Sequence, residues 1–130
     1  MKGLIAILMF VLALGVMPAD AASGKPETLR VQINKEKRSP KSRLSVRFLE
    51  LVEDSRCPVD TNCVWAGNAK IKVVVKRNGR SHELTLETNG PQHTAKVAGY
   101  SIKLVGLTPE PRSNIRIDRN GYVATLSITK

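Results

Sequence analysis

Alternation of apolar and polar residues is the main regularity of this chain beyond its N-terminal segment, and it is typical of short β-strands. Apolar side chains fill every second position in residues 29–33, 44–48, 100–104 and 122–128. The apolar run that begins at 44 extends to 52 and slips near 48–51, which predicts a β-bulge or burial on both faces. No long segment has the 3.6-residue apolar period of an amphipathic helix.

Residues 69–88 are the most strongly predicted element, a β-hairpin around Asn78-Gly79. Both residues of such a turn adopt positive φ, and Asn-Gly is the strongest short signal for it. A two-residue turn also fixes the register, so apolar residues face one another on one side and lysines lie near glutamates on the other. The expected opposite pairs are Val73 with Leu84, Ile71 with Leu86, Lys70 with Glu87, Lys72 with Thr85, and Val75 with His82.

Six or seven short strands separated by turns predict an all-β fold, a small antiparallel β-sandwich in a single domain over residues 29–130. An immunoglobulin-like or barrel-like arrangement stays open, because the pattern does not give the strand order. Residues 35–43 are expected to form a loop, since Ser39-Pro40 interrupts a run of basic residues there. Residues 113–121 are expected to form a polar crossover to the last strand.

The N-terminal segment has the pattern of a signal peptide. Lys2 precedes an uncharged apolar run over residues 4–17, and Ala19-Asp20-Ala21 follows as a cleavage site. The run is shorter than the roughly 20 residues that span a membrane. We therefore expect residues 1–21 to be removed, residues 22–28 to form a flexible tether, and the mature protein to be periplasmic or secreted, without stable insertion in a membrane. No cysteine lies near the cleavage site, so a lipid anchor is not predicted.

The chain is strongly basic, with 21 Lys and Arg against 11 Asp and Glu and a net charge of +10. Such a charge predicts an anionic partner, either a component of the cell envelope or an acidic protein, although charge can also serve only solubility. Export and the scarcity of aromatic residues argue against nucleic acid. The basic segment at 35–43 is either a solvated loop or an anion-binding patch. The residues of that patch would be Lys35, Lys37, Arg38, Lys41 and Arg43.

Residues 53–67 hold both cysteines and the only tryptophan, and they are therefore the first candidates for a metal, redox or catalytic site. In an exported chain, Cys57 and Cys63 are predicted to form a disulfide. Their spacing does not suit a zinc site or a Cys-x-x-Cys redox site, and Ile71 stands where a calcium loop would need glutamate. The chain has no Gly-x-Ser-x-Gly motif and only two histidines. No catalytic residue, metal or cofactor is therefore predicted.

Two roles remain open for this cysteine loop. It can act as a structural staple, with Trp65 shielding the disulfide and capping the core. It can also act as a pre-organised recognition loop, which is the form that protein inhibitors of proteases use. The candidate binding residues are Arg56, Pro58, Asp60 and Trp65. Arg56 is also expected to pair with Asp54, Asp60 or a carboxylate on another strand, and His82 is expected to be a partly buried structural residue.

The strings Asp54-Ser55-Arg56-Cys57-Pro58 and Cys63-Val64-Trp65-Ala66-Gly67 resemble the motif of an uncharacterised family of small exported bacterial proteins. The resemblance covers residues 44–77 and implies export and an all-β fold, but it implies no activity. We therefore expect an exported, non-enzymatic binding or structural module of the bacterial envelope. The alternative is an inhibitor of a secreted or periplasmic hydrolase that presents the loop between the cysteines.

Overall fold

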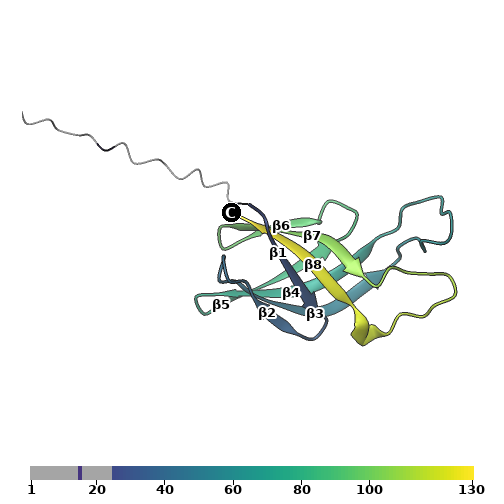
Figure 1. Cartoon of the computed structure of the whole chain (residues 1–130), viewed down its shortest axis with the longest axis horizontal. Helices are drawn as coiled ribbons and strands as arrows, with labels where there is room; N and C mark the ends of the chain where they lie inside the picture. The colour runs from purple at the N-terminus through teal and green to yellow at the C-terminus, as the bar shows by residue number, and fades with distance from the viewer. Residues whose placement is uncertain (1–14, 16–24) are drawn as a thin grey trace, which may run out of the picture.

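The computed structural model describes Gly15 and residues 25–130, which form two antiparallel sheets of four strands each (Figure 1). Apart from Gly15, the predicted signal peptide lies outside the described residues. One sheet has the order β1-β8-β7-β6 and the other the order β2-β3-β4-β5. The first sheet comprises β1 (Glu27–Gln32), β8 (Val123–Thr129), β7 (Tyr100–Thr108) and β6 (Thr94–Val97). The second comprises β2 (Glu36–Arg38), β3 (Ser45–Asp54), β4 (Ala69–Arg77) and β5 (Arg80–Glu87).

The all-β sandwich is confirmed, with eight strands instead of the six or seven expected. Strands β2 and β6 have no counterpart among the predicted apolar runs. Strand β2 lies inside the segment 35–43 that the sequence predicts as a loop, so that prediction is wrong in part. All three residues of β2 are exposed, and a strand with no buried position leaves no alternation to detect. The strand order differs from that of immunoglobulin domains, because each sheet here consists mainly of strands consecutive in the chain.

The β4–β5 hairpin has the predicted register. Val73 lies opposite Leu84 and Ile71 lies opposite Leu86, and the turn residues Asn78 and Gly79 both have positive φ. On the other face, lysines of β4 form ion pairs with glutamates of β5. These pairs are Lys70 Nζ with Glu87 Oε1 at 3.4 Å and Lys72 Nζ with Glu83 Oε1 at 3.7 Å.

Strand β3 carries the irregularity that its sequence predicts. Its pairing with β4 shifts between Phe48 and Glu50 and again between Leu51 and Glu53. These bulges let the apolar run of β3 continue without turning Glu50 into the core.

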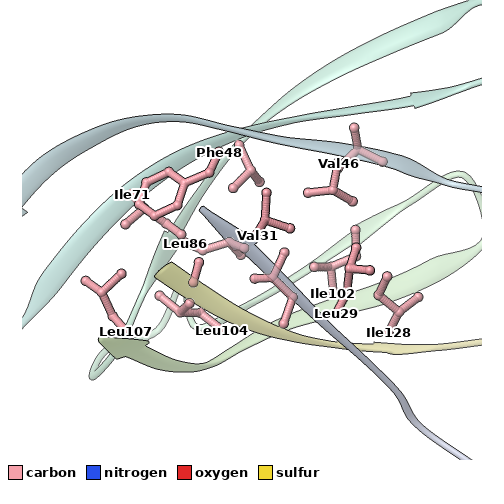
Figure 2. Packing of buried hydrophobic residues seen from close by; sticks show 14 of the residues in the cluster. Leu29, Val31, Val46, Phe48, Ile71, Leu86, Ile102, Leu104, Leu107 and Ile128 are labelled. Atoms are coloured by element: carbon pink, nitrogen blue, oxygen red, sulfur yellow. The ribbon is translucent and has the colours of Figure 1, made fainter. Parts of the chain in front are cut away.

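The core lies between the two sheets and receives the alternate residues of their strands (Figure 2). Phe48 of β3 and Ile102 of β7 are fully buried there, as are Ile71 and Leu86 of the hairpin. An isolated parallel bridge between Ile33, just after β1, and Phe48 of β3 joins the two sheets. No helix in the described part of the chain is long and apolar enough to span a membrane.

The N-terminal boundary of the fold differs from its prediction. Strand β1 begins at Glu27, so the last two residues of the expected tether 22–28 are paired with β8. Glu27 also accepts a hydrogen bond from the buried hydroxyl of Ser39, which joins the start of β1 to the turn between β2 and β3.

Candidate functional site

Two long loops extend together from one end of the sandwich (Figure 1). The first, residues 55–68, connects β3 to β4 and contains both cysteines; we call it the cysteine loop. The second, residues 109–122, connects β7 to β8. The backbone N–H of Val59 in the first loop donates to the carbonyl of Pro111 in the second at 3.0 Å. The two loops therefore support each other although they come from different sheets.

The predicted disulfide between Cys57 and Cys63 is present, with Cα atoms 5.9 Å apart. It closes a short ring at the outer part of the cysteine loop. A disulfide of this kind is stable only in a non-reducing environment of the extracellular type.

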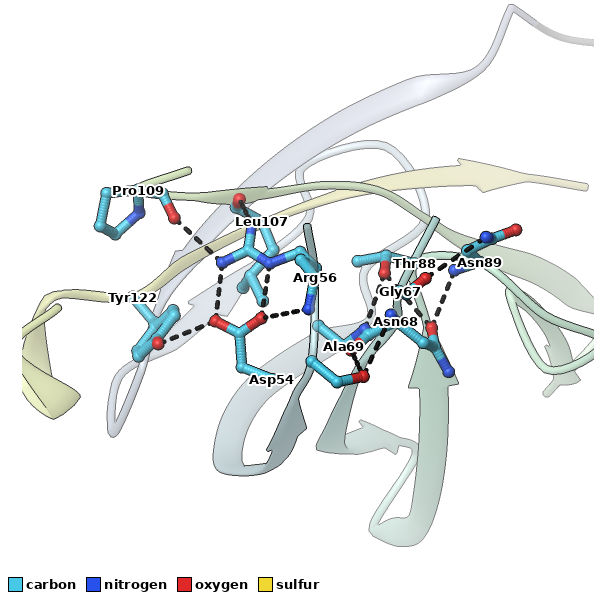
Figure 3. Close-up of polar contacts among 11 residues, drawn as sticks. Asp54, Arg56, Gly67, Asn68, Ala69, Thr88, Asn89, Leu107, Pro109 and Tyr122 are labelled. Carbon is cyan, nitrogen blue, oxygen red and sulfur yellow. Dashed lines mark hydrogen bonds and ion pairs between the residues drawn. The ribbon is translucent and has the colours of Figure 1, made fainter. Parts of the chain in front are cut away.

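Arg56 anchors the base of the cysteine loop to the opposite sheet (Figure 3). Its Nε and one Nη donate to the two carboxylate oxygens of Asp54 at 2.8 and 2.9 Å, so the pair is bidentate. The remaining donors reach the carbonyl oxygens of Leu107 at 2.6 Å and Pro109 at 3.0 Å, at the end of β7. Only 13% of the Arg56 side chain is exposed. The expected pairing of Arg56 with Asp54 is confirmed.

Tyr122 completes this network from the start of β8, since its hydroxyl donates to Asp54 Oδ2 at 3.0 Å. Burial by itself raises the pKa of Asp54, but the hydrogen bonds and the charge of Arg56, together with the Tyr122 hydroxyl, outweigh burial and hold that pKa below its usual value. Burial and the neighbouring Asp54 carboxylate raise the pKa of Tyr122. Asp54 is therefore charged and Tyr122 neutral at neutral pH, as this hydrogen bond requires.

Asp60 fixes the outer part of the cysteine loop to the second loop. Its carboxylate accepts hydrogen bonds from the Ser113 hydroxyl at 2.7 Å and from the Ser113 backbone N–H at 3.0 Å. These two hydrogen bonds lower the pKa of Asp60. Asp60 does not pair with Arg56.

At Gly67 the second arm of the cysteine loop, which leads into β4, packs closely against the first arm, which follows β3. Its φ is +72°, and a Cβ added there would collide with the backbone of Ser55, Arg56 and Cys57. Next to it, the Ser55 backbone N–H and hydroxyl both donate to the Asn68 carbonyl, at 2.7 and 2.8 Å. The base of the loop is therefore held by backbone packing as well as by side chains.

Trp65 lies on the surface, and the expectation that it shields the disulfide and caps the core is wrong. Its side chain is 71% exposed and that of the preceding Val64 is 96% exposed. We call these two residues the apolar tip. Trp65 is exposed because it lies on the loop beyond the ends of β3 and β4, where neither sheet covers it. Pro58 is half-buried beside the disulfide.

The five residues of the expected anion-binding patch are all exposed, but they do not lie at one place on the surface. Arg38, Lys41 and Arg43 lie around the turn between β2 and β3, far from the cysteine loop. Lys37 is one residue further along β2, and Lys35 lies beside Phe48 in the middle of the sandwich.

Neither histidine belongs to the cysteine loop. His82 faces Val75 as predicted, but it is exposed, so its expected partial burial is wrong. The reason is its position as the third residue after Gly79, in the exposed tip of the hairpin, where residues 78–83 are all exposed. Within residues 25–130 no three His, Cys, Asp or Glu side chains are grouped so that they could hold a metal ion.

Comparisons with family models, curated proteins and solved structures give no match. The function proposed for this site therefore depends on its geometry alone. Sequence reasoning selected Arg56, Asp60 and Trp65 but missed Val64, because a single valine carries no chemical signal. It also missed Tyr122, which looked like an ordinary core position of the last strand.

Proposed function

We propose that this protein is an exported, non-enzymatic binding module of the bacterial envelope that recognises a protein partner through the apolar tip, Val64 and Trp65. The observation that carries the proposal is the exposure of these two side chains, 96% and 71%, on a loop that is fixed at several points. Export is part of the proposal and is supported by the disulfide and by the signal-peptide pattern of residues 1–21.

The rigidity of the cysteine loop favours recognition over a purely structural role. The disulfide, the Arg56 network and the Asp60–Ser113 contact each restrain the loop before any partner binds. Binding to a pre-ordered loop costs little conformational entropy, which raises affinity. A loop that served only as a staple gains nothing from placing its tryptophan in water, since burial of so large an apolar side chain is favourable.

Trp65 and Val64 are available to a partner, whereas Arg56 is not. Tryptophan is one of the residue types that contribute most binding energy in protein interfaces. The guanidinium of Arg56, in contrast, already donates to Asp54, Leu107 and Pro109. The proposal therefore assigns contact with the partner to Trp65 and Val64, and it assigns to Arg56 the support of the loop.

Inhibition of a secreted or periplasmic hydrolase is a specific form of this proposal. It is supported by the covalent closure of the loop between Cys57 and Cys63 and by the projection of its tip beyond the sandwich. An inhibitor would insert the ring between Cys57 and Cys63, with the adjacent Val64 and Trp65, in the substrate cleft of the enzyme. Its partner would lose activity on binding, whereas the partner of an adaptor would not.

The test is capture of partners from an envelope extract by the immobilised exported protein, compared with its Trp65→Ala variant. Val105→Ser is a matched control, because Val105 is an apolar residue of β7 with 50% exposure. We expect Trp65→Ala to lose a protein that the wild type and Val105→Ser both retain. Equal capture by all three proteins would contradict the proposal.

Fluorescence gives a second measurement, because Trp65 is the only tryptophan. The free protein is expected to show the emission of a water-exposed indole, and the captured partner should shift that emission to shorter wavelength. Binding without any change in emission would place the interface elsewhere. Assay of the captured protein for hydrolase activity, with and without the module, then separates inhibition from simple binding.

A further inference from the structure

The charge of this protein is unevenly distributed between the two ends of the sandwich. The end opposite the cysteine loop contains the start of β1, the end of β8 and the turns β2–β3, β4–β5 and β6–β7. Basic residues that are far apart in the sequence meet there. We call this end the basic pole; its cations are Lys25, Arg38, Lys41, Arg43, Lys76, Arg77, Arg80, Lys96 and Lys130.

The register of the strands brings these residues together. In one sheet, Ser45 pairs with both Arg38 and Lys76, which places the β2–β3 and β4–β5 turns at the same level. In the other sheet, Ser101 pairs with both Lys96 and Thr129, next to the C-terminal Lys130.

Contacts between the sheets hold the pole together. Arg77 donates to the carbonyl of Ala98 at 2.7 Å, and its guanidinium lies 5.1 Å from the centre of the Tyr100 ring. On the other side, Glu27 accepts hydrogen bonds from the Ser39 hydroxyl and the Lys41 backbone N–H. The pole is therefore a surface built from both sheets.

The positive charge of the pole has little internal compensation. Glu27 is the acidic residue at this end of the described chain, and its carboxylate is half-buried in the contacts with Ser39 and Lys41. The three ion pairs found within residues 25–130 use Arg56, Lys70 and Lys72, none of which belongs to the pole. At the cysteine-loop end, by comparison, acidic and basic residues alternate. That end contains Glu53, Asp54, Asp60, Glu110 and Asp118 together with Arg56, Arg112, Arg116 and Arg119.

The shape of the pole suits a broad anionic surface. A shallow cleft of about 630 Å³ lies between the β4–β5 and β6–β7 turns, lined by Arg77, Asn78, Arg80, His82 and Ala98. A second, smaller cleft is lined by Tyr100 and by the charged residues Lys25, Lys41, Lys130 and Glu27. Cations at several corners of one end match many separate phosphates lying in a plane, whereas a single linear polymer would need one continuous groove.

Large exposed apolar residues are not found at this end of the described chain. Those that the structure exposes are Val52, Val59, Val64, Trp65, Val105 and Ile115, on the strands and at the opposite loops. Contact with a bilayer through the pole would therefore be electrostatic, at the level of the headgroups, and without insertion of side chains.

We propose that the basic pole docks on a membrane surface of anionic phospholipids, so that the apolar tip points away from the bilayer. Each Lys or Arg near such a surface adds to the attraction, which decays within a Debye length. This inference is independent of the proposed function, because the pole shares no residue with the cysteine loop. Together, the two surfaces would let the module hold a protein partner above a membrane.

The test is co-sedimentation of the exported protein with vesicles of phosphatidylglycerol and phosphatidylcholine, with pure phosphatidylcholine vesicles as a control. Two triple charge reversals are compared: Lys41→Glu, Arg80→Glu and Lys96→Glu at the pole, and Arg112→Glu, Arg116→Glu and Arg119→Glu at the loop end. All six residues are exposed and both variants lower the net charge by the same amount. Thermal melts confirm that each variant is folded.

We expect the pole variant to bind the anionic vesicles at least about tenfold more weakly than the wild type, and the loop-end variant to bind within about twofold. Equal losses in the two variants would overturn the proposal, because only net charge would then matter. Wild-type binding should also collapse between roughly 0.05 and 0.5 M salt. That measurement needs no variant, and salt-independent binding or equal binding to neutral vesicles would likewise overturn the proposal.

Orientation and ligand class are tested separately. Trp65 emission should stay unchanged on vesicle binding, and a shift to shorter wavelength would overturn the orientation. Trp65→Ala should bind vesicles like the wild type, so failure of the partner experiment and failure of the vesicle experiment are distinguishable. Tight binding to soluble polyphosphate without binding to phosphatidylglycerol vesicles would reject the lipid surface in favour of an anionic polymer.

Discussion

The Tyr122 hydroxyl donates to Asp54 Oδ2 at 3.0 Å and thereby joins the start of β8 to the end of β3, across the two sheets. The same carboxylate accepts hydrogen bonds from Arg56, so Asp54 joins the cysteine loop to Tyr122, which lies 68 residues further along the chain than Asp54. This half-buried contact fixes the base of the cysteine loop relative to the core.

Removal of the Tyr122 hydroxyl should destabilise the protein moderately. In Tyr122→Phe, Asp54 keeps Arg56 but loses one hydrogen bond, and we expect the free energy of unfolding to fall by about 1–2 kcal/mol. Urea denaturation followed by circular dichroism gives this value. Tyr100→Phe is the control, because it keeps the ring beneath Arg77 and should change stability by less than about 0.5 kcal/mol.

Removal of the Arg56 side chain should cost more, since two carbonyl groups lose this donor and the half-buried carboxylate of Asp54 keeps only Tyr122 as a side-chain partner. We expect Arg56→Ala to lower the free energy of unfolding by about 2–4 kcal/mol. Arg112→Ala, an exposed arginine of the neighbouring loop, should be nearly neutral. If Arg56→Ala were as mild as Arg112→Ala, the network would not support the loop.

Gly67 and Gly79 offer a matched pair of substitutions. Their φ values are +72° and +77°, but an added Cβ at Gly67 collides with backbone atoms whereas at Gly79 it meets open space. Gly79→Ala should therefore cost only the left-handed strain of about 1–2 kcal/mol. Gly67→Ala should cost at least about 2 kcal/mol more, measured by urea denaturation. Similar losses in the two variants would show that residues 55–57 can move aside.

The disulfide should stabilise the fold without determining it. We expect Cys57→Ser with Cys63→Ser to lower the free energy of unfolding by about 2–2.5 kcal/mol, from the lost restraint on the unfolded chain. The far-ultraviolet circular dichroism of the β-sandwich should be retained, because the core contains neither cysteine. Complete loss of the β spectrum in the double variant would instead make the disulfide a requirement for folding.

Stability at acid pH should depend on Asp54. Because its pKa is lower in the folded protein than in the unfolded chain, the unfolded state binds more protons as the pH falls, and stability decreases. The contribution is present above about pH 4, the pKa of an unfolded aspartate, and is lost as the pH falls through the folded pKa. Asp54→Asn should flatten the pH dependence of the free energy of unfolding in this acid range.

The slope that remains in Asp54→Asn is attributable in part to Asp60, whose pKa is also lowered, by Ser113. Adding Asp60→Asn should therefore flatten the curve further. Denaturation curves recorded at a series of pH values for both variants provide the measurement. An unchanged acid slope in Asp54→Asn would contradict a lowered pKa for this group.

The alternation of residues in this chain determined its strands, the Asn78-Gly79 hairpin and the bulge in β3, because period-two burial and turn chemistry are local properties. The presence of only two cysteines in a chain with a signal-peptide pattern likewise predicted the disulfide. Strands β2 and β6 were not predicted, because β2 has no buried residue and β6 has only Val97 buried among its four residues. Only their pairing with β3 and β7 reveals them.

Tertiary structure alone decided the contacts between distant residues and the composition of the surfaces, because both depend on which distant segments become neighbours. The strand order placed Tyr122 beside Asp54 and brought turns of both sheets, the start of β1 and the end of β8 together as the basic pole. The position of Trp65 on a loop beyond the ends of β3 and β4 left it exposed, although burial of so large an apolar side chain is favourable. A local pattern specifies which face of a strand is buried, but it carries no information on what lies across the core or beyond the end of the sheet.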